Sequence, residues 1–441
     1  MPVSPVAPIA ASDLLVFLLQ IGLLLLLAHG LGRLATRLGM PAVVGELGAG
    51  VLAGPSVLAH AAPAASAWLF PTAPARFHLL DAVGQLGVLL LVGLTGAHMD
   101  LALVRRRAAT AAGVSVGGLC VPLGLGVAAG VLLPRTLVPA GTDAMVFALF
   151  LGVAMCVSAI PVIAKTLMDM RMLHRDIGQL TLTAGMIDDA FGWCMLSIVS
   201  AMAGRAASAA SVGIALAHLA VVVAFTLTVG RPLVRLALRP AARSGEAGPA
   251  VAAATILILL AAAATHALGL EAVFGAFACG LLIGSAGRIE PAKLAPLRTV
   301  VLSALAPVFF ATAGLRMDLT ALGRPQVLLT GLAVLAIAVI GKFAGAYAGA
   351  RLSRLNRWEA LALGAGLNAR GVIEVVVAMV GLRLGILSVE IYTIVVLVAV
   401  VTSLMAPPIL RLAMARLAET AEEESRESEQ RAWITEPVSG P

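Results

Sequence analysis

The sequence predicts an all-α polytopic membrane protein of thirteen transmembrane helices, built from two inverted six-helix repeats. The composition sets this class, because 60% of the 441 residues are hydrophobic, only 12% are charged and the mean hydropathy is +1.02. A soluble domain carries about 25% charged residues. The net charge of +7 does not indicate nucleic-acid binding, because the basic residues are dispersed among short segments.

Apolar runs of about 20 residues, the length that crosses a bilayer, recur along the chain. No basic segment precedes the first run, so we interpret it as a retained helix rather than a cleaved signal. The predicted membrane domain covers 13–414, with spans at 13–31, 40–59, 79–98, 108–133, 143–164, 177–203, 209–230, 249–268, 271–287, 298–316, 326–350, 358–382 and 389–412.

The Lys and Arg residues orient these spans. Segments that follow odd-numbered spans, with the C-terminal segment, hold 22 of the 30 basic residues, and segments on the opposite side hold six. The other two, Lys342 and Arg370, fall within spans. Because basic residues concentrate on the cytoplasmic side, the sequence predicts a plasma-membrane protein with residues 1–12 outside and the C-terminus in the cytoplasm.

Two segments of the first half recur in the second. Residues 41–54 and 271–284 share Ala, Val, Gly, Gly, Leu and Gly at equivalent positions, and 96–101 matches 314–319. One match could be chance similarity between glycine-rich helices, but two in the same order favour a repeat of spans one to six in spans eight to thirteen. Span seven links the halves and inverts the second, as in secondary transporters.

The repeat predicts crossed broken helices in spans five and twelve. Span five contains Cys156–Ile163, where Pro161 removes a helix hydrogen bond, and span twelve contains the glycine-rich run Gly364–Gly371. An ordinary proline kink is the alternative. If both helices break, their ends offer free carbonyl groups and positive amino ends to ions. The predicted lining is Ser158, Ala159, Ile160, Pro161, Asn368 and Arg370.

Adjacent carboxylates, Asp188 and Asp189, lie inside predicted span six. One carboxylate at the bilayer centre costs about 2.5–3.5 kcal/mol, so intramembrane acids usually mark an ion or proton path. Consecutive helix residues point about 100° apart, so one aspartate can line a cavity while the other pairs with a cation. Lys342 is the candidate partner; its alternative is to extend toward the membrane surface.

Other polar residues in the spans have less specific interpretations. Arg370 and Glu374 lie one helical turn apart, which predicts a structural ion pair that holds the broken helix. Glu46 and Gln20 are interpreted as packing or cavity-lining residues. The four cysteines lack metal-ligand spacing and are interpreted as small packing residues, so no cofactor is predicted.

In these residues the chain resembles the monovalent cation:proton antiporter superfamily, and within it the branch of bacterial Na+/H+ and K+/H+ antiporters and plant cation/proton exchangers. The resemblance covers about residues 12–415. It rests on five elements in a fixed order, namely Pro41–Pro55, Ser158–Lys165, Asp188-Asp189, Gly341-Lys342 and Asn368–Glu374.

The resemblance implies that Asp189 is the essential aspartate at which cation and proton compete, and that Asp188 pairs with Lys342. It further implies a core of spans four to six and eleven to thirteen, and a scaffold of spans one to three and eight to ten that forms a homodimer. The position of Asp188 is acidic in electrogenic members and often Asn in electroneutral ones. The motifs of spans five and twelve are similar to plant K+ exchangers, which tend to have Asn-Asp, so Na+ and K+ both remain candidates.

The predicted function is exchange of Na+ or K+ for protons by alternating access, and the acidic Asp188 favours the electrogenic form of that exchange. A cation channel or uniporter on the same scaffold is the alternative, and an intramembrane aspartyl protease is a remote one, because its two aspartates would lie on different helices. No Gly-x-Gly-x-x-Gly motif follows a strand, so no nucleotide-binding domain is predicted. Residues 415–441 are acidic and predicted to be disordered.

Overall fold

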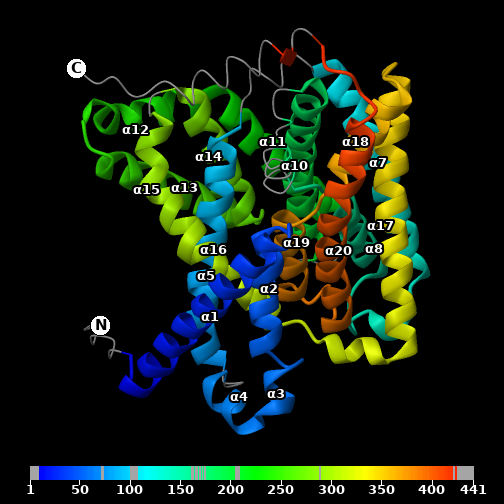
Figure 1. Ribbon diagram of the computed structural model, residues 1–441. Helices are drawn as coiled ribbons and strands as arrows, with labels where there is room; N and C mark the ends of the chain where they lie inside the picture. Colours follow the sequence, from blue (N-terminus) through cyan, green and yellow to red (C-terminus); the bar gives the residue numbers. More distant parts are fainter. Residues whose placement is uncertain are drawn as a thin grey trace.

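The computed structural model describes residues 9–70, 74–99, 108–159, 175–203, 209–287, 290–420, 423 and 424, and the single residues 163, 167, 170 and 172. These residues form helices joined by turns (Figure 1). The first half contains α1 (Ala11–Arg37), α2 (Ala42–Ala53), α3 (Leu58–Ala61), α4 (Pro63–Leu69), α5 (Pro74–Ala97), α7 (Ala108–Leu132), α8 (Ala144–Cys156) and α10 (Asp176–Ala203).

The remaining described helices complete the membrane domain. They are α11 (Ala209–Phe225), α12 (Arg231–Arg243), α13 (Gly248–Ala267), α14 (Ala272–Ala286), α15 (Ala295–Val300), α16 (Ala306–Gly314), α17 (Pro325–Leu352), α18 (Arg357–Leu367), α19 (Val372–Arg383) and α20 (Val389–Met414). Short 3-10 turns stand at Arg135–Leu137, Pro291–Leu294 and Leu319–Gly323.

The described residues confirm an all-helical polytopic membrane protein. Ten helical stretches are long and apolar enough to cross a membrane, and there are eleven if α18 and α19, bent by 44° at their break, count as one span. The shorter apolar helices α8 and α14 stand at the positions of predicted spans five and nine.

Two predicted spans have a different shape from the expected straight helix. Span seven does not end at residue 230, because a π-turn at Thr226–Gly230 continues it into α12. The arginines of α12 recur every fourth residue, which suits one polar helical face. Span ten is α15 and α16 joined by a second π-turn at Val301–Leu305.

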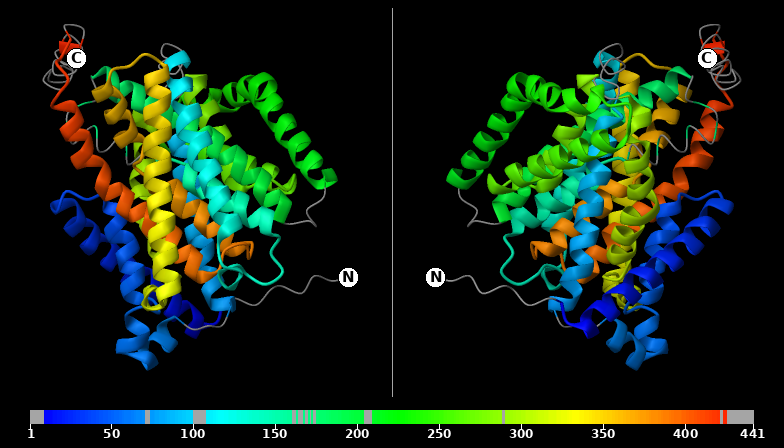
Figure 2. Two further views of the ribbon diagram at one scale, coloured as in Figure 1. Left: turned by 90° about the vertical axis from the view of Figure 1, so that its right-hand side faces the viewer. Right: turned by 90° about the vertical axis from the view of Figure 1, so that its left-hand side faces the viewer.

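The helices form two groups that lie side by side. Figure 1 shows α1, α2, α5, α13, α14 and α16 in one group and α7, α8, α10, α17, α18, α19 and α20 in the other, as their contacts also indicate. Figure 2 shows α17 running the height of the molecule. In both figures α12 lies at the end opposite α3 and α4, so the arginines of α12 mark the predicted cytoplasmic end.

Glycines make the closest contacts between helices of one group. A methyl group on Gly50 of α2 would overlap the carbonyl oxygen of Ala311 in α16, and one on Gly280 of α14 would overlap that of Gly93 in α5. Gly50 and Gly280 are equivalent in the two repeated segments. Backbones that touch in this way are typical of helix packing in lipid.

The second group has the same kind of contact between α7 and α17. A methyl group on Gly117 would overlap the carbonyl oxygen of Gly345, and one on Gly345 would overlap that of Gly117. These two helices are spans four and eleven, which the predicted repeat relates to each other. The close glycine contacts therefore occur at corresponding places in both halves of the chain.

The described part of the acidic C-terminal segment is held against the start of α10, which differs from the disorder predicted from residue 415. The guanidinium group of Arg175 contacts Glu419 at 2.9 Å and Glu423 at 3.3 Å. Glu423 also accepts a 2.7 Å hydrogen bond from the N–H of Asp176. Burial raises the pKa of Glu423, but the N–H groups of Thr420 and Asp176 outweigh it and hold that pKa below its usual range.

We predict that Gly345→Ala lowers the melting temperature, because the added methyl group overlaps the backbone of α7 and overpacking costs about 1–3 kcal/mol. Gly22→Ala is the control, since Gly22 of α1 has open space where its methyl group would go. That change should leave the melting temperature unchanged or slightly higher. Thermal unfolding in detergent measures both, and equal shifts would contradict the close contact.

Candidate ion-binding site

The middle of α10 carries both predicted aspartates. Asp188 and Asp189 lie near the centre of the 28-residue helix, and neither side chain has any exposed surface. Lys342 of α17 is equally buried. The lysine therefore does not extend to the membrane surface, which was the alternative left open by the sequence.

Asp188 and Lys342 form a buried ion pair. The ammonium nitrogen of Lys342 lies 2.6 Å from Oδ2 of Asp188 and donates a second hydrogen bond, also 2.6 Å, to the carbonyl oxygen of Cys156. The hydroxyl of Ser158 lies 2.8 Å from the same Oδ2. A buried charge needs such partners to offset the loss of water, and Asp188 has them.

Asp189 is in the opposite situation. Neither of its carboxylate oxygens has a hydrogen-bond partner among the described residues. The 100° turn between consecutive residues explains the contrast, because the helix face that points Asp188 at Lys342 points Asp189 elsewhere. The structure thus pairs Lys342 with Asp188 and shows no partner for the Asp189 carboxylate in the part of the chain that it describes.

The two broken segments meet beside this pair. The N–H of Ala159, three residues after α8 ends, donates a 3.1 Å hydrogen bond to the carbonyl of Ala369, between α18 and α19. The Ser158 hydroxyl lies 2.9 Å from the carbonyl of Leu367, and it can donate to this carbonyl or to Asp188 at one time. The predicted lining residues Ile160 and Pro161 lie outside the described residues.

Arg370 caps the buried end of α8. Its guanidinium group donates to the carbonyls of Ala154 at 3.2 Å and Met155 at 2.6 Å, and to Glu374 at 3.3 Å. A helix end buried in the membrane leaves carbonyl groups that water cannot reach. The expectation that these carbonyls are free for a cation is therefore wrong for α8, because Arg370 and Lys342 occupy them.

Polar atoms without partners surround the same region. The amide nitrogen and oxygen of the Asn368 side chain and Oε2 of Glu374 are buried and lack hydrogen-bond partners among the described residues. Asn368 follows Leu367, whose carbonyl shares Ser158 with Asp188, so its backbone lies beside this cluster. Buried groups of this kind normally have partners, so these atoms are available to a ligand.

Three polar residues near the site were not predicted from the sequence. Ser403 of α20 donates to the carbonyl of Arg370, and Ser197 and Trp193 of α10 have buried polar atoms without partners in the described part of the chain. Trp193 and Ser197 follow Asp189 by one and two helical turns. That spacing was available in the sequence and would have placed them on the face of Asp189.

The chain resembles known proteins over most of its length. Residues 22–416 match the family model described as "Sodium/hydrogen exchanger, transmembrane". The chain is 31% identical over 402 residues to the Na(+)/H(+) antiporter NhaS4 of Synechocystis sp., covering 90% of this chain and 97% of that protein. The chain belongs to the sodium/hydrogen exchanger family.

This membership confirms the resemblance to the monovalent cation:proton antiporter superfamily. The exchanger is a cation/proton antiporter and not an enzyme. It is also 29% identical to cation/H(+) antiporter 17 of Arabidopsis thaliana, but it spans about half of that protein, 48% of its length. The sodium proton antiporter MjNhaP1 of Methanocaldococcus jannaschii has the same fold, with a TM-score of 0.68 and 17% identity over 92% of this chain and 100% of that one.

We predict that Arg370→Ala strongly destabilises the exchanger, because it uncovers two carbonyls of α8 and leaves Glu374 unpaired; breaking a buried pair costs about 3–5 kcal/mol. Arg324→Ala removes an ion pair to Glu390 whose arginine side chain is 58% exposed. A surface pair of that kind contributes about 0–1 kcal/mol. Melting temperatures in detergent compare the two variants, and similar shifts would show that Arg370 has no special capping role.

Proposed function

We propose that Asp189 is the residue at which the exchanged cation and the proton compete. The supporting observation is the contrast between neighbours, since Asp188 has Lys342 and Ser158 as partners and Asp189 has none in the described part of the chain. A buried carboxylate without a partner is costly in its charged form. A bound cation or a bound proton removes this cost, and the carboxylate holds one of them at a time.

The exchanged cation in this proposal is Na+ or K+. The names of similar proteins include both ions, as in the Na(+)/H(+)-K(+) antiporter GerN of Bacillus cereus, which is 27% identical over 407 residues. Hard cations prefer oxygen ligands, and no group of three or more His, Cys, Asp or Glu suited to a metal occurs in the described residues. Asp189 would therefore share the cation with the Asn368 amide, backbone oxygens and water.

The exchange is proposed to be electrogenic. Beside Asp189, Asp188 adds one negative group and Lys342 adds one positive group. The ammonium group of Lys342 carries a proton in addition to the one that Asp189 can bind. In this proposal, cation binding at Asp189 breaks the pair between Asp188 and Lys342, and the lysine passes on its proton as the second one. More than one proton then moves for each cation.

The proposed architecture has thirteen spans in two inverted repeats. It counts α8 and α14 as spans five and nine and the bent pair α18 and α19 as span twelve. The paired glycine contacts support the repeat, since Gly50 in span two and Gly280 in span nine contact their neighbours in the same way. The crossing of residues 157–159 with 367–371 supports broken helices in spans five and twelve.

Transport is proposed to occur by alternating access, with spans four to six and eleven to thirteen as a core that moves against a scaffold of spans one to three and eight to ten. Side-chain contacts between the two groups include Trp193 with Phe277 and the hydroxyl of Tyr392 with the carbonyl of Ala313. Both lie in the half of the membrane that the Lys and Arg distribution places outside. These contacts support an inward-facing state, closed toward the outside.

The cellular setting of the proposal comes from the charge distribution and the family. The protein lies in the plasma membrane with its N-terminus outside and its C-terminus in the cytoplasm. The scaffold forms a homodimer, as the family resemblance implies. Leucines of α1 are exposed in the single chain, and lipid or a second copy would cover them.

We predict that Asp189→Asn abolishes cation-driven proton movement while the protein still folds, because the amide can neither take up the proton nor neutralise the cation. The measurement uses proteoliposomes with an internal pH dye, to which Na+, K+ and Li+ are added in turn. Wild-type exchange by this variant would rule out Asp189 as the site. Cation flux that ignores an opposing proton gradient in the wild type would favour a channel.

We predict that the wild type is driven by an imposed membrane potential and that Lys342→Gln loses this response. Because Lys342→Gln leaves Asp188 as an unpaired buried charge, Asp188→Asn with Lys342→Gln is the matched control that removes both charges. The double variant should exchange in a voltage-independent way. A wild type indifferent to voltage would contradict electrogenic exchange, and a voltage-driven Lys342→Gln protein would show that the lysine only braces the helices.

A further inference from the structure

A row of buried polar groups runs along α10 from Asp189 toward the extracytoplasmic end. Trp193, Ser197 and Ser200 follow Asp189 at intervals of four, four and three residues, which places all of them on one helix face. Each side chain is buried, and the indole N–H and both hydroxyls lack partners among the described residues. Unpartnered polar groups in such a row are costly, unless water or an ion meets them.

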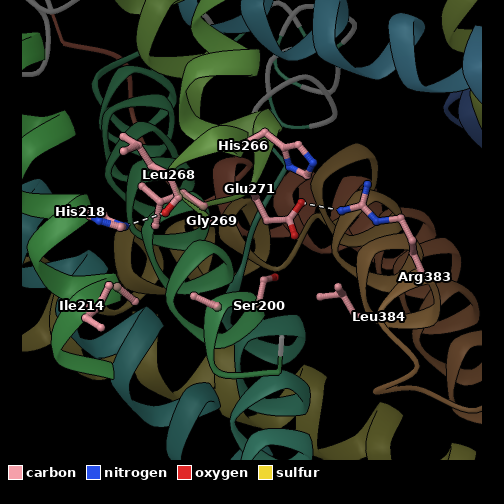
Figure 3. Close-up of a pocket in the computed structure, with 12 residues that line it drawn as sticks. Ser200, Ile214, His218, His266, Leu268, Gly269, Glu271, Arg383 and Leu384 are labelled. Carbon is pink, nitrogen blue, oxygen red and sulfur yellow. Dashed lines mark hydrogen bonds and ion pairs between the residues drawn. The ribbon is translucent and has the colours of Figure 1, made fainter. Parts of the chain in front are cut away.

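The row ends at a cavity. A space of about 440 Å³ opens between the end of α10, the middle of α11, the turn from α13 to α14 and the end of α19, and Ser200 lines it. Figure 3 shows Ser200 and Leu384 below Glu271, His266 above it, and His218 to one side. Ser200 is 11 residues from Asp189, so the cavity begins roughly 16 Å from the proposed site.

One ion pair crosses this cavity between the two helix groups. Glu271, the residue before α14, is buried, and Arg383 at the end of α19 lies 2.8 Å from its carboxylate. The arginine side chain is 42% exposed and the glutamate side chain 7%. Among the described residues, the other titratable groups that line the cavity are His218, whose Nδ1 lies 2.6 Å from the Leu268 carbonyl, and the exposed His266.

The way from the cavity to Asp189 is closed by an aromatic contact. The Trp193 ring of α10 lies against Phe277 of α14, with ring centres 6.4 Å apart. This contact and the Glu271–Arg383 pair both join a helix of one group to a helix of the other. A movement of the groups relative to each other changes both at once.

We propose that this cavity is the outer vestibule of the exchanger, in which Glu271 is the first carboxylate to receive a monovalent cation from outside and Ser200, Ser197 and Trp193 line its path to Asp189. The proposal rests on Asp189 as the exchange site. While Arg383 is paired with Glu271, the guanidinium group neutralises the carboxylate and repels an approaching cation. When the groups separate, Glu271 loses this partner and the cation takes its place.

The test measures access to single cysteines from outside. Ser197→Cys and Ser200→Cys are made in a chain whose four native cysteines are replaced and which still exchanges, and a membrane-impermeant maleimide is added to right-side-out vesicles. Ser200→Cys, which lines the cavity, should react faster than Ser197→Cys, which lies one turn deeper. Adding Arg383→Gln should speed the reaction of Ser197→Cys roughly fivefold, because losing a partly exposed pair shifts a two-state equilibrium by about that factor.

Arg324→Gln is the matched control, since its ion pair to Glu390 lies outside the cavity and within one helix group. It should leave both labelling rates unchanged. An unreactive Ser200→Cys, or equal rates for Ser197→Cys with Arg383→Gln and with Arg324→Gln, would overturn the vestibule. These readouts do not depend on Asp189, so they separate a failure of the path from a failure of the proposed site.

Kinetics on the native chain give a second test that needs no cysteine. Glu271→Gln should raise KM for the external cation relative to Arg383→Gln, because both variants break the ion pair and only Glu271→Gln also removes the charge that the cation meets on binding. Arg383 is partly exposed, so water can solvate its guanidinium group when Glu271 no longer pairs with it. A KM equal to that of Arg383→Gln, or a fall in kcat with KM constant, would show that Glu271 does not receive the cation.

Discussion

The termination of α8 inside the membrane is the constraint on which the site depends. Ending a helix there leaves carbonyl groups that no water can reach. Two basic side chains donate hydrogen bonds to these carbonyls, Arg370 from the α18–α19 break and Lys342 from α17. These buried basic side chains in turn require acidic partners. Glu374 pairs with Arg370 and Asp188 pairs with Lys342, and Asp189 is left without a partner among the described residues. The charged side chains of the site are therefore explained by the need to satisfy the carbonyl groups at the end of α8.

The same logic explains why two carboxylates stand next to each other on one helix. Asp188 has Lys342 and Ser158 as partners, and Asp189 has none among the described residues. Adjacent residues on different faces of α10 can therefore have different surroundings. In the proposed exchange, one side chain receives the cation and its neighbour holds the ion pair on which that cation acts.

Much of this arrangement could be predicted from the sequence, because it depends on the position of charges along apolar runs. The aspartates, Lys342 and the Arg370–Glu374 pair stand out against lipid-facing residues. The use of Arg370 and Lys342 as caps of α8 could not be predicted, because it depends on which carbonyls the crossing brings within reach. The contacts of Glu419 and Glu423 with Arg175 could not be predicted either, because the composition of that segment alone indicates an acidic segment in solvent.

The glycine contacts have a mechanical consequence. Within each helix group backbone touches backbone, as at Gly117 and Gly345, and such an assembly is hard to compress or shear. Between the groups, the contact of Trp193 with Phe277 joins side chains instead of backbones. Movement of one group past the other therefore requires only side chains to repack where the groups meet, while the backbone contacts inside each group stay intact.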